Sequence, residues 1–282
     1  MNFISQTDIV HHTKTIFQSK EKFLFCILTI NDIVILQGGS KMYSKRLREK
    51  GLLHFIGGSD YHFRQTASEE RILADYQRLF KEAGINEPDE IYSGHQTHSS
   101  NVAWVDNTTG EPFIIGEQFP NMDGLFTMKE NVALIIKFAD CTPIVLYDPI
   151  EKVQALVHSG WRGTVFEISK NALQKMIEEG GSKIENILAY IGPSIDQDHY
   201  EVGPEVYEAF SMNPDRERFF KPHGNKFLLD MTLANYHLLL QSGIKEENIE
   251  IEQTSTFIDK NLHSARQEGK DYQLNALVTC MK

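Results

Sequence analysis

Short runs of apolar residues recur along the whole chain and predict strands. Many are rich in Val, Ile, Leu and Phe, which suit the pleated, half-buried surface of a sheet. The early stretch FLFCILTINDIVILQ is interrupted by Asn31 and Asp32, which predicts two strands joined by a turn. The predicted strands cover residues 23–30, 33–37, 101–105, 132–138, 143–147, 153–157, 187–191, 226–229, 249–252 and 274–279.

Apolar positions spaced three and four residues apart predict helices between these strands. Residues 68–83 carry such a stripe; Thr66 and Glu69 are spaced as a capping box, and Gly84 is a natural stop. Three further helices are predicted, starting at Thr164, near Pro204, and after the N-cap Asp230. Strands and helices mixed throughout predict an α/β or α+β fold. No repeat, low-complexity tract or linker interrupts them, which predicts one continuous domain over residues 1–282.

The overall charge excludes some partner classes. The formal net charge is −11, which argues against non-specific nucleic-acid binding but not against a small anionic substrate held by one local arginine. The most basic stretch, residues 41–50, is typical of a charged helix face. No apolar segment is long enough to span a bilayer, so we expect no membrane partner. The sequence gives no indication of the oligomeric state.

The three cysteines, Cys26, Cys141 and Cys280, predict a reducing compartment. Their number is odd and they lie far apart, so a disulfide framework is not expected. The N-terminus has no basic region followed by an apolar core, so we expect no signal peptide and a cytoplasmic protein. We interpret Cys26 as a small buried apolar residue and Cys280, next to the terminus, as incidental.

Three segments place a candidate metal ligand at the edge of a predicted strand: GHQTHSSNV (94–102), KFADCTPIVLYDP (137–149) and VHSGWRGTV (157–165). Their candidates are His98, Cys141 and His158, residue types that bind transition metals. Single histidines are more often surface residues and single cysteines more often buried ones. The gaps between the three match no short zinc-binding pattern, so the residues alone indicate a site without defining it.

The turn HSGWRG is the most informative of these segments. Gly160 and Gly163 flank Trp161 and Arg162, so the backbone can turn sharply and approach a ligand. Arg162, at the start of a predicted helix, is a candidate for holding an anion. The alternative is a plain connection from strand to helix with Trp161 in the core.

Six motifs in order carry a resemblance to a known family: QTHS (96–99), DGLFT (123–127), ADCTP (139–143), HSGWRG (158–163), IGPS (191–194) and YEVGPEV (200–206). Together they resemble the laccase-domain family, also called multicopper polyphenol oxidase-like proteins and re-described as purine nucleoside phosphorylases. The resemblance covers about residues 68–280. It implies mixed β-sheets sandwiched by helices, similar to the catalytic domain of cytotoxic necrotizing factor, a cysteine hydrolase.

The resemblance also implies the cofactor and the reaction. In that family the residues matching His98, Cys141 and His158 bind zinc, with copper as the alternative metal. The implied reaction is phosphorolysis of adenosine, inosine and methylthioadenosine, with adenosine deamination as a further activity. Purine nucleoside and phosphate are therefore the expected ligands.

The chain departs from the family at three places. Ser194 stands where cysteine is usual, and LHSARQEG (262–269) keeps only Ser264 and Arg266 of an aromatic-Ser-Tyr-Arg-Arg segment. FIGGSDYHF (55–63) replaces a Thr-Arg-x-Gly-Gly stretch. These departures predict altered substrate contacts.

Three protein ligands would leave the fourth position of a tetrahedral zinc open for chemistry. Arg162 would then orient phosphate, and Asp140 and Asp123 are the candidates for moving protons or orienting groups. A second hypothesis is a metal-free hydrolase of a small amide or cell-wall precursor, with Cys141 as nucleophile and His158 as base. Copper-dependent polyphenol oxidation and a non-enzymatic binding protein are the remaining alternatives.

Overall fold

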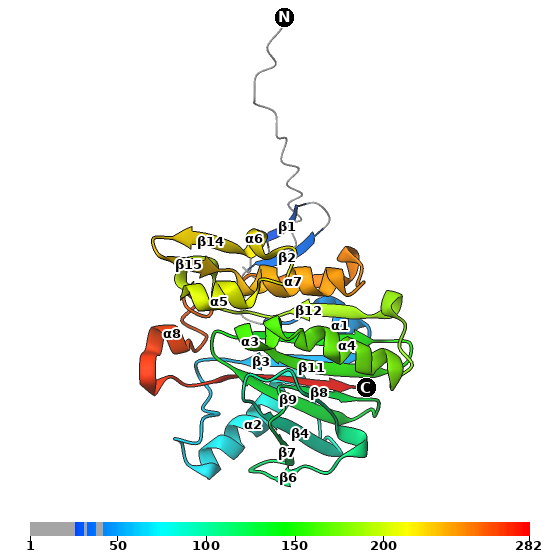
Figure 1. The fold of residues 1–282 in the computed structure, drawn as a ribbon. Coiled ribbons are helices and arrows are strands. Elements are labelled where there is room, and N and C mark those ends of the chain that lie inside the picture. Colours follow the sequence, from blue (N-terminus) through cyan, green and yellow to red (C-terminus); the bar gives the residue numbers. More distant parts are fainter. Residues whose placement is uncertain (1–25, 31–32, 38–41) are drawn as a thin grey trace, which may run out of the picture.

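The computed structural model describes residues 26–30, 33–37 and 42–282, with the backbone alone for the first two segments. In this part of the chain the strands form a mixed sheet of eight strands, called the large sheet below, a second mixed sheet of six, and one small antiparallel sheet (Figure 1). The large sheet has the order β1 (Cys26–Ile30), β2 (Ile33–Gln37), β16 (Ile249–Glu252), β12 (Leu188–Ile191), β10 (Thr142–Asp148), β11 (Val153–Ser159), β8 (Gly124–Thr127) and β5 (Val102–Trp104).

The second sheet has six strands and the small sheet three. In the second sheet β4, β7 and β9 run parallel, and the other neighbours run antiparallel. Its order is β3 (Leu52–Gly57), β17 (Asn275–Met281), β9 (Val132–Phe138), β4 (Glu90–His95), β7 (Glu117–Pro120) and β6 (Glu111–Pro112). The small sheet has the order β13 (Glu201–Val202), β15 (Lys226–Leu229) and β14 (Phe220–His223).

The two larger sheets pack face to face over a shared core. Val145 and Tyr147 of β10 join Leu134 and Ile136 of β9 in one buried cluster between the sheets. Successive side chains of a strand point to opposite faces, so the alternate residues of β10 and β9 belong to two other clusters, on the outer faces. This is why these strands read as continuous apolar runs, like strands covered on both sides.

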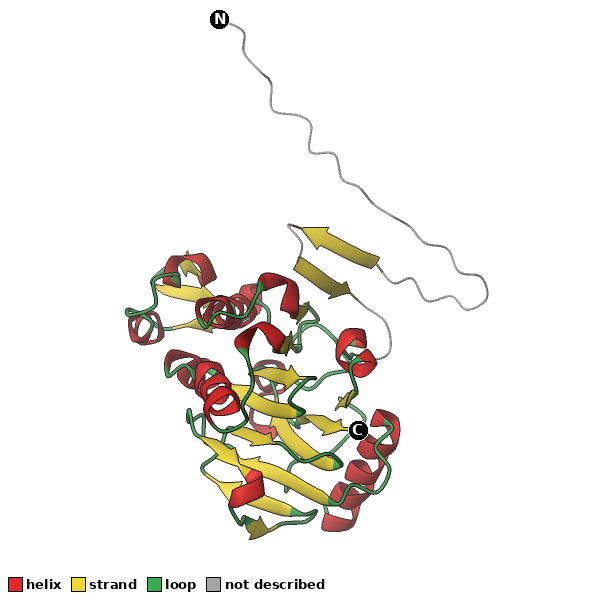
Figure 2. Cartoon of the chain, turned by 90° about the vertical axis from the view of Figure 1, so that its right-hand side faces the viewer, coloured by secondary structure: helices red, strands yellow, loops and turns green. Residues whose placement is uncertain are grey.

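Helices cover both outer faces of the sandwich, giving four layers (Figure 2). Helix α2 (Glu69–Ala83) packs on the second sheet, and helices α4 (Ile168–Glu178) and α7 (Met231–Gln241) pack on the large sheet. The remaining helices are α1 (Lys45–Glu49), α3 (Trp161–Val165), α5 (Pro204–Ala209), α6 (Arg216–Phe219) and α8 (Ala265–Glu268). The predicted α+β class with mixed sheets is confirmed, whereas the likeness to cytotoxic necrotizing factor stays a prediction.

The structure corrects two helix starts. Ser68, not Thr66, caps α2, because its hydroxyl accepts the Arg71 N–H. The helix predicted from Thr164 is two helices, α3 and α4, separated by Glu167 at φ 56°, a left-handed conformation that no helix continues. The predicted stop at Gly84 is confirmed by its left-handed φ of 78°.

The predicted strands are present, but several short ones were missed. Strands such as β3, β4 and β7 mix polar and apolar residues over few positions, so their pattern is weak. Residues 23–25 of the first predicted strand and the side chain of Cys26 lie outside the described part, so the strand start and the burial of Cys26 stay predictions. Cys280 lies on β17 with 2% of its surface exposed, which corrects its interpretation as an incidental terminal residue. Among the described residues, no helix is long and apolar enough to cross a membrane.

Candidate metal centre and its pocket

Three connections cross from the second sheet to the large sheet at one end of the sandwich. They join β4 to β5, β7 to β8 and β9 to β10, and they carry His98, Asp123 and Cys141 respectively. Because β4, β7 and β9 run parallel, their carboxyl ends meet at the same edge. His158, on β11, pairs with Pro143, two residues after Cys141, and so reaches the same edge.

Each crossing contains a residue other than glycine with a left-handed backbone. The φ angles are 61° at His98, 54° at Asn121 and 81° at Asp140. Histidine, asparagine and aspartate tolerate this region better than most residues, but it still carries strain. Strained backbone held in place by surrounding structure is common at functional sites.

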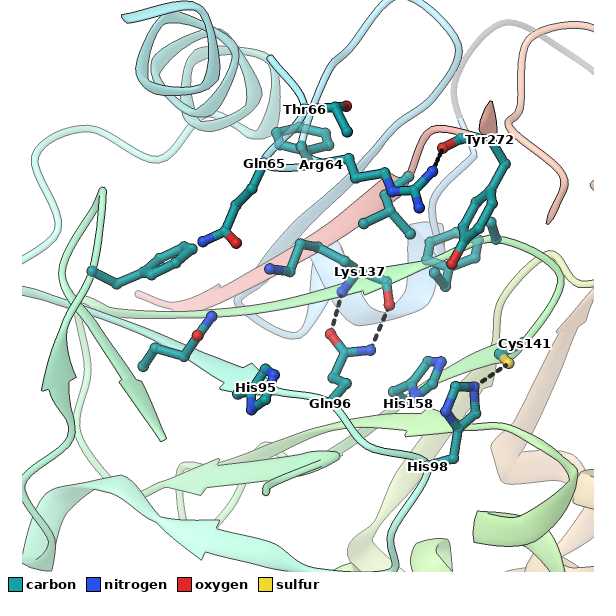
Figure 3. A pocket seen from close by; sticks show the side chains of 17 residues that line it. Arg64, Gln65, Thr66, His95, Gln96, His98, Lys137, Cys141, His158 and Tyr272 are labelled. Atoms are coloured by element: carbon teal, nitrogen blue, oxygen red, sulfur yellow. Dashed lines mark hydrogen bonds between the residues drawn. The ribbon is translucent and has the colours of Figure 1, made fainter. Parts of the chain in front are cut away.

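His98, Cys141 and His158 form a candidate metal centre (Figure 3). One ligand atom from each lies within 4.8 Å of the others, and Cys141 Sγ is 3.7 Å from His98 Nε2. Ligand atoms around one tetrahedral zinc lie roughly 3.3–3.6 Å apart. The three side chains therefore lie together in the structure, while their binding of a common metal ion stays a prediction.

Gly160 keeps the space beside these ligands open. A Cβ at this position would lie 2.6 Å from His98 Cδ2 and 3.1 Å from Cys141 Sγ. Both contacts are too close for a side chain, so only glycine fits here without moving a ligand. The glycine-rich turn after His158 thus serves the site by leaving room.

Asp123 holds two of the candidate ligands through its buried carboxylate. Oδ1 accepts hydrogen bonds from His158 Nδ1 at 2.8 Å and from the His98 N–H at 3.0 Å. Oδ2 accepts the N–H groups of Thr97 and Ser99 and the Ser99 hydroxyl. Burial raises the pKa of Asp123. The hydrogen bond and charge of His158 and the hydrogen bond from Ser99 have the larger combined effect, and they lower the pKa to about 2. An ionised Asp123 directs His158 Nε2 toward the cluster.

Cys141 and His158 favour opposite charges. Burial raises the pKa of the Cys141 thiol, but the neighbouring His158 and His98 outweigh burial and lower it to about 6. Burial lowers the pKa of His158, whereas the Cys141 thiolate and Asp123 raise it to about 9. Cys141 is therefore a thiolate at neutral pH, the form that binds metals and attacks carbonyl groups.

Asp140 fixes the loop beside Cys141. Its Oδ1 accepts the Thr256 hydroxyl at 2.7 Å and its Oδ2 accepts the Arg266 N–H at 2.7 Å. Its carbonyl accepts the Ile195 N–H. Both carboxylate oxygens are thus engaged in holding neighbouring segments, so the arrangement fits an orienting role better than proton transfer.

Arg162 is exposed and is not among the residues that line the pocket next to the metal candidates. Its guanidinium lies 4.2 Å from the Trp161 ring. Trp161 in turn packs against the apolar cluster around α5 and the small sheet. The structure thus supports the alternative interpretation of Trp161 as a packing residue, whereas the anion-binding role of Arg162 stays a prediction.

A pocket of about 450 Å³ opens onto the candidate centre. Aromatic side chains form much of its wall, and polar residues line the rest (Figure 3). Besides His98, Cys141 and His158, the lining consists of Phe63, Arg64, Gln65, Thr66, Gly94, His95, Gln96, Phe113, Gln118, Lys137, Phe138, Ala139, Tyr272 and Leu274.

Gln96 and Lys137 also belong to the site, although neither was predicted from the sequence. The Gln96 side chain donates to the Lys137 carbonyl at 2.6 Å and accepts the Lys137 N–H at 2.8 Å, which links the two segments beyond Ser93 and Ile135, the last paired residues of β4 and β9. Burial lowers the pKa of Lys137 to about 8. A lysine inside the apolar run VALIIKF was a usable signal, because lysines are rarely placed in buried strands.

The departures from the family pattern lie around the site. Ser194 shares a hydrogen bond of 2.8 Å with the Thr232 hydroxyl. Ser264 caps the short helix α8, and Arg266 donates to the carbonyls of His199 and Glu201. Phe63, at the end of the FIGGSDYHF segment, lines the pocket.

The fold and the cluster define an α+β protein with a candidate metal centre at the crossing between two mixed sheets. The chain belongs to the family described as multi-copper polyphenol oxidoreductase laccase, whose family model matches residues 54–280. The resemblance predicted from the six motifs is thereby confirmed.

Two relatives have names that concern nucleosides. The chain is 33% identical over 203 residues to a purine nucleoside phosphorylase of Bacteroides thetaiotaomicron, covering 68% of this chain and 74% of the relative. It is 34% identical over 206 residues to adenosine deaminase RL5 from an unknown prokaryotic organism, covering 71% and 78%.

Two solved structures share the fold. The hypothetical protein YfiH of Bacillus licheniformis superposes with a TM-score of 0.78 at 21% identity, covering 86% of this chain and 97% of that one. YlmD of Geobacillus stearothermophilus superposes with a TM-score of 0.74 at 19% identity, covering 94% and 98%. At these identities the likeness speaks for the fold alone.

Proposed function

We propose that the protein is a zinc-dependent purine nucleoside phosphorylase for adenosine, inosine and methylthioadenosine, with adenosine deamination as a second activity. The observation that carries the proposal is the cluster of His98, Cys141 and His158, which faces a pocket lined by both aromatic and polar side chains. The names of the relatives point to the same substrates.

The donor set fits zinc. Two imidazoles and one thiolate are typical zinc ligands, and three of them leave a position open toward the pocket. The same donors suit copper. A multi-copper oxidase needs several metal sites, and the described residues contain one cluster of this kind, so we favour zinc.

The pocket suits the reaction in several ways. In phosphorolysis a phosphate oxygen bonds to ribose C1′ while the C1′–N9 bond breaks and the purine takes the electron pair and a proton. A zinc ion would polarise a substrate atom or activate water. Asp123 keeps His158 oriented, and Asp140 holds the loop of Cys141. Phe113 and Tyr272 offer apolar faces to a purine.

Arg162 is the predicted phosphate-orienting residue; its guanidinium lies 4.2 Å from the centre of the Trp161 ring and outside the lining of this pocket. Arg162→Lys keeps the charge and removes the planar fork. Unchanged turnover in this variant would remove Arg162 from the mechanism.

Metal analysis with a product assay tests the proposal. The purified protein should carry about one zinc per chain, as expected for a single site. With adenosine or inosine it should release purine base and ribose 1-phosphate only when phosphate is present. Conversion of adenosine to inosine and ammonia without phosphate would show the deaminase activity. Absence of both reactions in zinc-loaded protein would contradict the proposal.

A metal-free cysteine hydrolase is the second candidate, and one observation favours it. Asp123, His158 and Cys141 are ordered like a catalytic triad, with a thiolate beside an imidazole held by a carboxylate. His98 Nε2, 3.7 Å from the same sulfur, has no role in such a triad but is needed in a metal centre. A chelator that removes the metal should abolish phosphorolysis and spare a cysteine hydrolase.

We also infer a reducing, cytoplasmic setting and a small-molecule substrate. The free thiols of Cys141 and Cys280 and the acidic net charge of −11 support this inference.

A further inference from the structure

The pocket beside the candidate metal centre carries a charge opposite to that of the molecule. The whole chain has a formal net charge of −11. The described residues that line the pocket nevertheless include Arg64 and Lys137 and neither an aspartate nor a glutamate. Two fixed cations without a carboxylate, in an acidic protein, indicate a pocket that attracts an anion.

Lys137 is the cation whose backbone is most firmly placed. It lies near the end of β9, four residues before Cys141, and Gln96 bonds both its N–H and its carbonyl. Its side chain is half-buried, and its ammonium lies 5.2 Å from the centre of the Phe113 ring. Figure 3 shows it extending toward the side of the pocket where Gln65 lies, away from Cys141.

Lys137 has no acidic partner within the described part of the chain. Other lysines do pair with carboxylates; within the described ranges these are Lys45, Lys129, Lys152, Lys170, Lys175 and Lys226. An ammonium that is partly removed from water without a counter-ion is costly. An anionic ligand would relieve this cost on binding.

Arg64 lines the same pocket and is held in place by neighbouring groups. Its Nη1 donates to the carbonyls of Lys270 and Tyr272, and its guanidinium lies 4.5 Å from the Tyr272 ring centre. These contacts use one of its nitrogens, so further N–H groups remain for a ligand. Arg64 thus adds positive charge without depending on a ligand for its position.

We propose that Lys137 binds a phosphate dianion in this pocket, with Arg64 adding electrostatic attraction from elsewhere in the pocket lining. The phosphate is either the free ion consumed in phosphorolysis or a phosphate group carried by a nucleoside. The proposal rests on the proposed function for the first source, and it moves the anion-binding role predicted for Arg162 to Lys137. Gln65 and His95, which line the same pocket, can add hydrogen bonds to phosphate oxygens.

Binding of inorganic phosphate tests the proposal without requiring turnover. Isothermal titration calorimetry would compare the wild-type protein with Lys137→Met, Lys137→Arg and the control Lys129→Met, at matched metal content. Lys129 is an exposed lysine paired with Glu90, outside the pocket lining. Thermal unfolding without phosphate would verify that each variant is folded.

We expect Lys137→Met to lose about 10- to 100-fold in phosphate affinity, the usual effect of removing a charged hydrogen-bond donor. Lys137→Arg should keep most of the affinity and Lys129→Met all of it. Wild-type affinity in folded Lys137→Met, for both phosphate and adenosine 5′-monophosphate, would overturn the proposal.

A comparison of adenosine with its 5′-monophosphate identifies the source of the phosphate. If the ion is a co-substrate, phosphate should bind in the presence of saturating adenosine, and the monophosphate should gain nothing over adenosine. If the substrate carries the group, the monophosphate should bind at least about tenfold more tightly than adenosine, and only through Lys137. Phosphate binding that depends on Lys137 without any base release would uphold this proposal and contradict the phosphorylase.

Discussion

At the scale of single residues, the site depends on the charge state of Cys141. The thiol is free, partly exposed and flanked by two histidines. A hydroxyl is a far poorer zinc ligand than a thiolate, because it must lose a proton at much greater cost. The two cysteines with described side chains therefore differ in kind, one reactive and one packed in the core.

Cys141→Ser should lose both metal and activity, whereas Cys280→Ser should keep both. Cys280 is buried on β17, so its replacement by a polar serine should cost roughly 1–3 kcal/mol of stability. Metal content by mass spectrometry, turnover and thermal unfolding would measure these effects. Full zinc content with lost turnover in Cys141→Ser would favour the cysteine hydrolase, and full activity without metal would contradict both functions.

The pH dependence of thiol alkylation should also separate the two cysteines. The histidines lower the pKa of Cys141 to about 6, whereas burial, the larger cause, and then Asp89 raise that of Cys280 to about 11. In metal-free protein, iodoacetamide should react fast with Cys141 above pH 6 and progressively more slowly below it. Cys141→Ser is the control that should remove the fast phase. A fast phase that appears only above about pH 8, near the ordinary thiol pKa, would contradict the thiolate assignment.

At the scale of elements, the Gln96 side chain makes the hydrogen bonds to β9 that the backbone of a paired strand residue would make. Strand β4 ends at His95, yet the amide of Gln96 bonds to Lys137 as a further step of the pairing with β9. This bond sets the separation of two segments that lead to His98 and Cys141. We therefore regard Gln96 as a positioning residue for the metal candidates.

Gln96→Ala should weaken zinc binding by about 10- to 100-fold, the usual effect of losing a residue that orients ligands. The matched control is Gln118→Ala, since Gln118 lines the same pocket but its side chain donates only to the Ser93 hydroxyl among the described residues. Competition with a chromophoric chelator would measure both affinities. Equal affinity of the two variants would show that the ligand positions do not depend on the Gln96 bond.

At the scale of the whole molecule, the sequence predicted the core elements and the candidate ligands but not how they meet. Apolar runs such as 132–138 and 143–147 are long enough to stand out, and six motifs marked His98, Cys141 and His158. The three crossings lie side by side because β4, β7 and β9 pair in parallel. The residues paired in this way are far apart in the sequence. No local pattern reports such pairing, so the bonds of Gln96 and Asp123 and the place of Lys137 in the pocket came only from the structure.

Asp123 links these crossings through hydrogen bonds, so the stability of the whole fold should depend on the ionisation of its carboxylate. Its carboxylate bonds to the 97–99 segment and to His158 on β11, while its own segment is the crossing from β7 to β8. Its pKa is lowered from 3.8 to about 2 on folding, with burial opposing and the bonds from His158 and Ser99 prevailing. A lowered pKa contributes stability above the unfolded value, and this stability is lost as the pH falls from about 4 toward 2.

Asp123→Asn should therefore be less stable than the wild type at pH 7 by roughly 2 kcal/mol, and the difference should shrink as the pH falls below about 4. The amide should also misorient His158 and weaken zinc binding. Urea unfolding of metal-free protein between pH 3 and pH 7 would measure the first effect without the metal. The exposed Asp60→Asn is a suitable control, because it lies outside the crossings and should change stability little at any pH. A constant difference between Asp123→Asn and the wild type across this range would mean that the ionised carboxylate does not hold the crossings together.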